Sequence, residues 1–233
     1  MAQTGICAVC GLQKKLTFEH FQPKAAGNNE KAIMKFGKHI FPIDEHLYGK
    51  QVVSHKGFGS YTLCKACNSL GGSNYVKAYV ELYDVLQGLS KKKNDGQYYE
   101  ITSSIYPLNV LKEVVMIFLS ADRSLGTLRR MMADFVVDTE SQKLTDEVTI
   151  YMFYALGTVY QAMGLSFGLT EFGPHSIAKF IYPPMGFLLT VGDAPLVDGL
   201  YDMSHFTAYR IDEKAELKIK LKVIEETIDI NFN

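Results

Sequence analysis

The strictest alternation of apolar and polar residues lies near the end of the sequence, at residues 216–223. Charged and aliphatic side chains alternate there in the order Glu-Leu-Lys-Ile-Lys-Leu-Lys-Val. Because successive side chains of a strand point to opposite faces, this period of two predicts a strand with its lysines in water and its aliphatic residues in a core. Shorter apolar segments predict further strands at residues 149–154, 178–182 and 186–191.

Apolar residues recur at helical spacing in three other parts of the chain. Residues 107–121 begin with Pro107, a residue favoured in the first turn of a helix, and carry an apolar face. Similar patterns predict helices at residues 76–86 and 125–137, the first of them after a pause at the Gly-Gly-Ser of residues 71–73. Helices and strands together predict the α+β fold class.

The longest uncharged stretch, residues 148–170, covers 23 positions and is long enough to cross a bilayer. It nevertheless contains Gln161, four Ser or Thr residues and three Gly, and its start resembles a half-buried strand. It also lacks the flanking Lys and Arg residues that orient membrane helices. We therefore expect no membrane association, and we interpret the stretch as a buried strand followed by a turn or a short helix.

The chain has 233 residues and a net charge of −1, with 47% hydrophobic residues, as is usual for globular proteins. The charges are unevenly distributed along the chain, because residues 1–80 contain ten lysines and only four acidic residues. The remaining residues are acidic overall. The lysines are either a solvated surface or a phosphate-binding module, and charge alone favours nucleic acid only weakly.

All four cysteines occur as two Cys-x-x-Cys pairs: Cys7 and Cys10, then Cys64 and Cys67. Two such pairs supply the four thiolates of a tetrahedral structural Zn²⁺ site. Unrelated buried thiols and a redox pair are the alternatives, although a redox pair does not explain two copies. Because the N-terminus lacks a secretory pattern, we expect a cytoplasmic protein with reduced thiols.

Between the cysteine pairs, an apolar–polar alternation at residues 16–21 predicts a short strand ending at Pro23. It carries Glu19-His20-x-x-Pro23-Lys24, and Asn68 directly follows the last cysteine. This combination resembles the HNH endonucleases, over roughly residues 5–80. The resemblance implies a ββα-metal fold with a treble-clef zinc site. Adjacent residues of a regular strand point to opposite sides, so we expect a local irregularity to aim Glu19 or His20.

The resemblance further implies hydrolysis of DNA phosphodiester bonds, leaving a 5′-phosphate and a 3′-hydroxyl. Glu19 and Asn68 would hold a catalytic Mg²⁺ or Mn²⁺, for which oxygen donors are suited. His20 would be the general base that activates water. A role in antiphage defence or mobile-element biology is a further expectation.

Three other residues near the motifs are candidate site residues. Lys24 and Lys56 are expected to contact phosphate, and His55 is expected to orient water, bind metal or contact phosphate. Three features depart from the family pattern. Gly59, Ser60 and Tyr61 occupy the region of the middle Asn, Asn68 replaces the last His, and the insertion at residues 27–58 is long.

The charged, turn-rich residues 90–96 predict a boundary between two domains, and the alternative is a solvated loop at the end of a helix. Residues 1–90 would form the HNH nuclease domain with its zinc site. Residues 97–233 would form an α+β accessory domain for specificity, dimerisation or regulation. Since one HNH site cuts one strand at a time, double-strand cleavage would favour a homodimer.

Each motif residue also has a structural interpretation. His20 can bond a backbone carbonyl, and Asn68 can cap the helix that follows the second cysteine pair. The alternative function is therefore a non-catalytic, zinc-stabilised module that binds DNA or protein. The remaining histidines lack a surrounding motif and are interpreted as structural or surface residues: His39, His46, His175 and His205.

Overall fold

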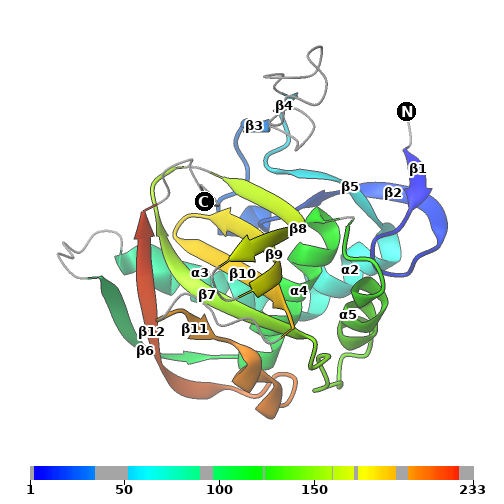
Figure 1. The fold of residues 1–233 in the computed structure, drawn as a ribbon. Coiled ribbons are helices and arrows are strands. Elements are labelled where there is room, and N and C mark those ends of the chain that lie inside the picture. Colours follow the sequence, from blue (N-terminus) through cyan, green and yellow to red (C-terminus); the bar gives the residue numbers. More distant parts are fainter. Residues whose placement is uncertain are drawn as a thin grey trace.

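A computed structural model describes residues 3–34, 52–89, 97–122, 124–158, 160–170, 173–192 and 199–225 of the protein. These residues form both helices and β-sheets (Figure 1). The predicted α+β class is therefore confirmed.

The N-terminal part is a small antiparallel sheet followed by two helices. The sheet contains β1 (Thr4–Ile6), β2 (Gln13–His20) and β5 (Gly59–Cys64), in the order β1-β2-β5. Helix α2 (Lys65–Asn74) starts directly after β5, and α3 (Val76–Leu89) follows it. The second cysteine pair therefore lies where a strand ends and a helix begins.

The connection between β2 and β5 contains the 3-10 helix η1 (Lys24–Ala26) and a short hairpin. The hairpin consists of β3 (Ala32–Met34) and β4 (Val52–Ser54), which pair antiparallel. Figure 1 shows it standing above the body of the molecule. His39 and His46 lie outside the described residues.

A larger, seven-stranded sheet occupies the second half, in the order β6-β12-β7-β10-β9-β8, with β11 paired to β7. Neighbouring strands are antiparallel except β12 and β7, which are parallel. Its strands are β6 (Tyr98–Ile105), β7 (Val148–Leu156), β8 (Gln161–Thr170), β9 (Gly173–Tyr182), β10 (Met185–Val191), β11 (Tyr201–Asp202) and β12 (Ala215–Glu225).

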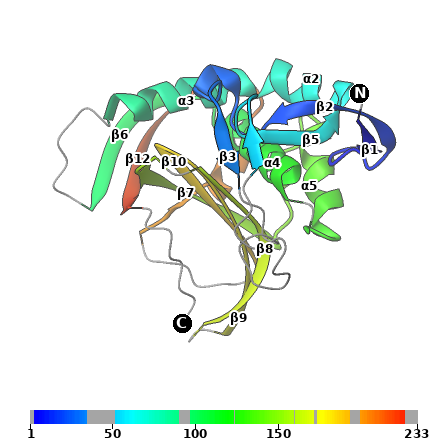
Figure 2. The ribbon, with the colours of Figure 1, turned by 90° about the horizontal axis from the view of Figure 1, so that it is seen from above.

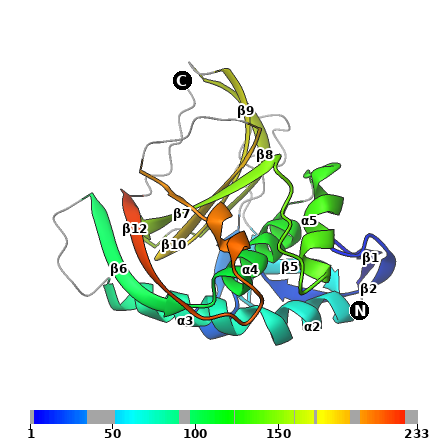
Figure 3. The ribbon, with the colours of Figure 1, turned by 90° about the horizontal axis from the view of Figure 1, so that it is seen from below.

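Helix α4 (Pro107–Ala121) is the centre of the molecule. Every residue from 107 to 120 is buried, and apolar side chains occur on all sides of the helix beside a few buried polar ones. It packs on α2, α3, β5, β8 and β9, on α5 (Leu128–Val137) and on the 3-10 helix η2 (Ser204–Ala208). Figures 2 and 3 show α4 between the N-terminal sheet and the curved larger sheet.

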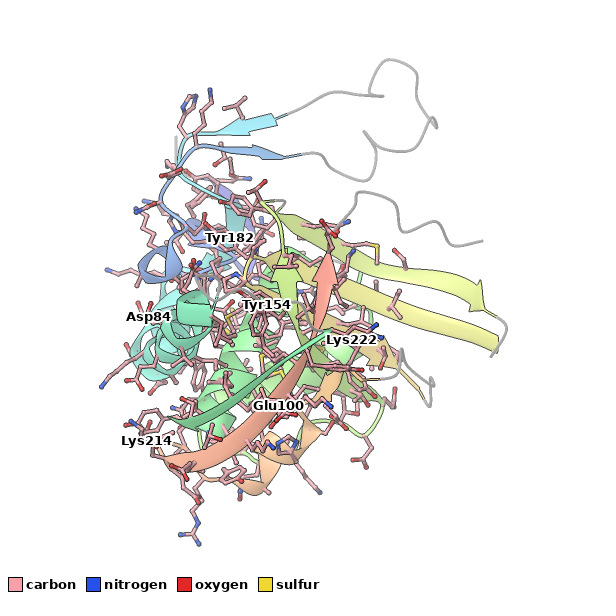
Figure 4. All side chains as sticks on the ribbon, turned by 90° about the vertical axis from the view of Figure 1, so that its left-hand side faces the viewer. Asp84, Glu100, Tyr154, Tyr182, Lys214 and Lys222 are labelled. Carbon is pink, nitrogen blue, oxygen red and sulfur yellow. The ribbon has the colours of Figure 1, made fainter. Side chains whose placement is uncertain are left out.

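The alternating segment forms β12 as predicted. The side chains of Lys218 and Lys220 are 71% and 55% exposed, whereas Ile219 and Leu221 are fully buried. Lys218 also forms a 3.0 Å ion pair with Glu100 of the neighbouring β6. Figure 4 looks toward these two strands and labels Glu100 and Lys222.

Most other element predictions are confirmed. The predicted bounds of α4 agree with the structure, and α3, α5, β7, β9 and β10 include or overlap their predicted segments. The uncharged stretch forms β7, a turn and a second strand, β8, so the short-helix interpretation is wrong. Across the described ranges, no helix is both long and apolar enough to span a membrane.

The pause predicted at residues 71–73 is also wrong, because α2 continues through Gly71 and Gly72 and ends only before Tyr75. Gly71 lies against α4: a Cβ atom there would be 3.2 Å from the Met116 methyl group. Close helix packing thus outweighs the cost of glycine inside a helix.

One hydrophobic cluster runs from Cys7 in the N-terminal part to Leu221 in β12. Residues on both sides of the expected domain boundary therefore share a core, with α4 in its middle. The boundary segment, residues 90–96, lies outside the described residues. The division into residues 1–90 and 97–233 stays a prediction.

A cavity of about 350 Å³ lies where the two parts meet. Its wall includes Gly27 and Tyr83 from the N-terminal part and Tyr154 and Tyr182 from the larger sheet. Figure 4 labels Tyr154 and Tyr182. Tyr182 stacks on Tyr160, with ring centroids 4.2 Å apart. No cysteine and no predicted catalytic residue lines this cavity.

Lys112 is a charged residue of α4 with no exposed surface. Its ammonium group donates hydrogen bonds to the backbone oxygens of Phe135 and, at 2.9 Å, of Asp138, at the C-terminal end of α5. A cation is favourable there, because the last carbonyl groups of a helix lack partners within it. Burial nevertheless lowers the pKa of Lys112 to about 8.

We predict that Lys112→Met lowers the free energy of unfolding by about 1–3 kcal/mol, because two buried carbonyl oxygens lose their donor. Urea unfolding measures the effect. The matched control is Lys77→Met, which removes an exposed lysine from α3 and should change stability by less than about 0.5 kcal/mol. Equal stability of the two variants would contradict this role of Lys112.

Candidate metal and catalytic site

The four cysteines meet at one point of the structure. Their sulfur atoms all lie within 4.8 Å of one another, and the Cys10 and Cys64 sulfurs are 4.0 Å apart. Sulfurs around a tetrahedral zinc ion are about 3.8 Å apart, given Zn–S bonds of about 2.3 Å. The predicted clustering is therefore confirmed, and the donor set fits a structural metal ion such as zinc.

Two turns of the backbone build this cluster. Cys7 and Cys10 lie in the turn between β1 and β2, while Cys64 ends β5 and Cys67 lies in the first turn of α2. Gly11 closes the first turn in the left-handed region, at φ 69°, and its N–H donates to the Cys7 oxygen at 3.0 Å. Such a backbone conformation favours glycine.

Backbone N–H groups surround the Cys7 sulfur. The Cys64 N–H donates to it at 3.3 Å. Burial on its own raises the pKa of Cys7, but N–H groups of Cys64, Cys10 and Val9 overcome this effect and lower it to about 7. A thiolate, the form that binds metal, is thereby favoured at this position.

Arg129 of α5 connects the first cysteine turn to the rest of the core. One of its terminal nitrogens donates to the Ala8 oxygen at 2.9 Å and to the Leu119 oxygen at 3.0 Å. The other donates to the Asp122 oxygen just beyond α4. The turn that holds Cys7 and Cys10 is thus fixed against the end of the central helix.

Glu19 and Asn68 are brought together on one side of β2. Asn68 donates to the Thr17 hydroxyl at 3.0 Å and also hydrogen-bonds the Glu19 carboxyl group. Burial raises the pKa of Glu19 to about 8, although the bond from Asn68 opposes the rise. The capping interpretation of Asn68 is wrong, because Cys64 occupies the N-cap of α2 and Asn68 lies further along the helix.

His20 lies on the other side of the strand, where its ring meets Phe18 edge to face with centroids 5.0 Å apart. The imidazole hydrogen-bonds the backbone of Lys56, as the structural interpretation expected. Its Nε2 atom is buried and has no hydrogen-bond partner among the described residues. Burial lowers the pKa of His20, and the positive charges of Lys24 and Lys56 lower it further.

The predicted irregularity exists, but it does not bring Glu19 and His20 to the same side. The β2–β5 pairing shifts register between Thr17 and Phe18, and Thr62 of β5 has no partner across the strands. Beyond this bulge Glu19 and His20 still contact opposite sides. Gly59, opposite His20, allows close approach of the two strands: a Cβ atom there would be 2.1 Å from the Glu19 oxygen.

The predicted phosphate-binding lysines lie on the His20 side. Lys24 starts η1, and Lys56 lies in the turn after β4. The ammonium group of Lys56 donates to the Tyr61 hydroxyl at 2.9 Å and lies 5.5 Å from the Phe18 ring centroid. His55 is exposed in the same turn. The structure thus groups the two lysines with His20, and Glu19 with Asn68.

Two further histidines, interpreted from the sequence as structural or surface residues, belong to the second half of the chain. His205 is exposed in η2, and its Nε2 atom lies 2.9 Å from the Tyr201 hydroxyl. His175 belongs to β9, but its side chain is outside the described part of the structure.

Sequence reasoning missed Glu113 of α4, which faces the Glu19 side of the site. Its side chain is buried, and burial together with the charge of Glu19 raises the pKa of Glu113 to about 8. The sequence did contain a signal. Val110 and Ile117 flank Glu113 at helical spacing, so Glu113 lies on a largely apolar side of the helix, which indicates that it is buried.

Comparisons with protein-family models, with curated proteins and with solved structures found no match to this chain. The resemblance of the N-terminal motifs to HNH endonucleases therefore stays a prediction from the sequence.

We predict that the purified protein holds about one zinc ion per chain, bound by the four cysteines. Cys67→Ser should reduce the bound zinc to below about a tenth of that amount and lower the midpoint of thermal unfolding, because structural zinc contributes folding energy. Elemental analysis and circular dichroism provide the measurements. The control is Ser69→Ala, an exposed position of the same helix. Zinc-free wild-type protein would contradict the prediction.

Proposed function

We propose that this protein is a metal-dependent HNH-type endonuclease that hydrolyses DNA phosphodiester bonds. The observation that carries the proposal is the contact between Glu19 and Asn68 directly beside the four-cysteine cluster. The motif resemblance assigns these two residues to one catalytic metal. The order β2, β5, α2 around the cluster agrees with the ββα arrangement that the resemblance implies.

Glu19 and Asn68 are the residues that would hold the cation. A carboxylate and an amide oxygen are hard donors, which suit Mg²⁺ or Mn²⁺ better than the thiolate cluster does. When bound, such a cation stabilises the negative charge that develops on the phosphate and on the leaving oxygen. Asn68 directly follows Cys67, so the metal that orders the cysteines also fixes the position of Asn68.

His20 is assigned the role of general base. The bond to the Lys56 backbone orients the ring and leaves Nε2 without a partner. A base must be neutral before it accepts a proton from water, and both burial and the nearby lysine charges favour the neutral imidazole. The structural and catalytic interpretations of His20 are thus compatible.

Lys24 and Lys56 are assigned to phosphate binding. Both ammonium charges act on His20, so they lie close to the proposed base. Among the described residues, neither lysine forms an ion pair with an acidic side chain. A DNA phosphate in contact with the two lysines would therefore neutralise their positive charges. His55 is exposed and directly precedes Lys56, so it is assigned to phosphate binding together with the two lysines.

The burial of Glu19 favours a second candidate function. Glu19 faces the interior beside α2, on the opposite side of β2 from His20. If the acid only anchors Asn68 and the cysteine cluster, the N-terminal part is a zinc-stabilised module that binds DNA or protein without cutting. The two functions differ in whether removal of His20 abolishes a metal-dependent reaction.

We predict that the zinc-loaded protein cleaves DNA in the presence of Mg²⁺ or Mn²⁺ and that EDTA stops the reaction. His20→Ala should reduce the cleavage rate by about 10²–10⁴-fold, which is the usual contribution of a general base. Gel assays on supercoiled and linear DNA measure the rate. The matched control is His205→Ala, which removes an exposed histidine elsewhere and should retain full activity.

Two results separate the candidates. Equal rates for His20→Ala and wild type would remove the assignment of His20 as the base. Binding of DNA without cleavage, for linear, supercoiled and branched substrates with either cation, would favour the non-catalytic module.

A further inference from the structure

We propose that Glu113 of α4 is a third ligand of the cation site formed by Glu19 and Asn68, so that Mg²⁺ or Mn²⁺ binds there between two carboxylates and an amide. The inference rests on the proposed function only in taking Glu19 and Asn68 as ligands. It adds a residue from beyond the motif region, on the helix that forms the centre of the fold.

The packing of α2 on α4 places Glu113 toward the face of α2 that carries Asn68. Asn68 and Gly71 are one helical turn apart on α2 and therefore share a face. The Glu113 Oε2 atom is 3.7 Å from the position that a Cβ atom of Gly71 would take. Asn68 in turn contacts Thr17 and Glu19 of β2. The two acids thus approach the same part of α2, one from the sheet and one from α4.

Glu113 is a buried acid without a partner. The residue is 4% exposed, and its Oε2 atom has no hydrogen-bond partner among the described residues. Burying an ionised carboxylate without compensation costs several kcal/mol in proteins, so such a group takes up a proton unless it binds a partner or a metal ion. A divalent cation would replace the proton and supply the partner that Glu113 lacks beside the second acid.

The neighbouring polar groups of the protein do not supply that partner. Lys112 directly precedes Glu113 in the chain, but its ammonium group donates to the Phe135 and Asp138 carbonyl oxygens. The hydroxyl of Tyr75 donates to the Val136 oxygen at 2.7 Å, and the hydroxyl of Tyr79 donates to Gln22. The one charged group that shifts the pKa of Glu113 among the described residues is another acid, Glu19.

These three ligands favour a hard, divalent cation. Two carboxylates balance a charge of +2, and carboxylate and amide oxygens suit Mg²⁺, Mn²⁺ or Ca²⁺ rather than thiophilic metals. Glu19 and Asn68 are only half-buried, whereas Glu113 is buried. A cation would therefore enter past Glu19 and Asn68 and meet Glu113 at the inner end of the site.

The test is Mn²⁺ binding to the full-length, zinc-loaded protein without nucleic acid. Free Mn²⁺ is quantified by electron paramagnetic resonance during a titration of wild type, Glu113→Gln and Glu19→Gln. Both substitutions keep the side-chain shape and remove one charge. Each should raise the Kd for Mn²⁺ by about tenfold or more, because ligand charge sets the affinity of such sites.

The matched control is Glu100→Gln, which neutralises an exposed acid on β6 (Figure 4) and should leave the Kd unchanged. Zinc content and circular dichroism establish that each variant is folded. A second readout is the increase in the midpoint of thermal unfolding when Mn²⁺ is added. Because a ligand that binds more tightly stabilises the folded state more, this increase should be smaller in a variant that binds Mn²⁺ more weakly.

The inference is overturned if wild type binds no Mn²⁺, or if folded Glu113→Gln binds it as tightly as wild type does. These outcomes differ from a failure of the proposed function. Glu113-dependent Mn²⁺ binding without cleavage of any DNA substrate would support the third ligand and reject the nuclease. DNA cleavage with Mn²⁺ affinity independent of Glu113 would reject the third ligand alone.

Discussion

The complete burial of α4 is the constraint on which the rest of the structure depends. A helix that is buried on all sides has no face for solvent, so every side must be covered by another element. The N-terminal sheet with α2 and α3 covers part of it, and α5, η2 and the larger sheet cover the remainder. The motif-bearing region therefore shares its core with the second half, and its geometry depends on a helix that no motif identifies.

Two independent attachments fix Asn68. At the start of α2, Cys64 and Cys67 belong to the metal-binding cluster, and Asn68 is the next residue. One turn later, Gly71 holds the helix close against α4. Because both ends of this short segment are constrained, the Asn68 side chain stays against Thr17 and Glu19. A structural metal bound by the cysteines would thus order Asn68 through the backbone, without taking part in the proposed chemistry itself.

Local patterns predicted the elements, whereas contacts between distant elements decided the details. The periods of two and 3.6 residues located β12 and α4, and the spacing of Cys7, Cys10, Cys64 and Cys67 predicted their cluster. Sequence reasoning failed at Gly71, where a local helix-breaking preference is overcome by packing on α4. It also missed Glu113, whose role depends on a neighbour 94 positions earlier in the chain, Glu19. The helical spacing of its apolar neighbours indicates that Glu113 is buried, but it does not indicate which distant residue Glu113 meets.

The opposite orientations of Glu19 and His20 constrain how one phosphate could meet both. In the middle of a strand, the sheet would separate two groups that project from its two sides. His20, however, is the last residue of β2, and its partner Gly59 presents no side chain beside it. In the proposed nuclease, this end of the strand is therefore the place where one phosphodiester would meet both His20 and the Glu19–Asn68 pair. The lysines near His20 favour that position, because they concentrate positive charge at the same end.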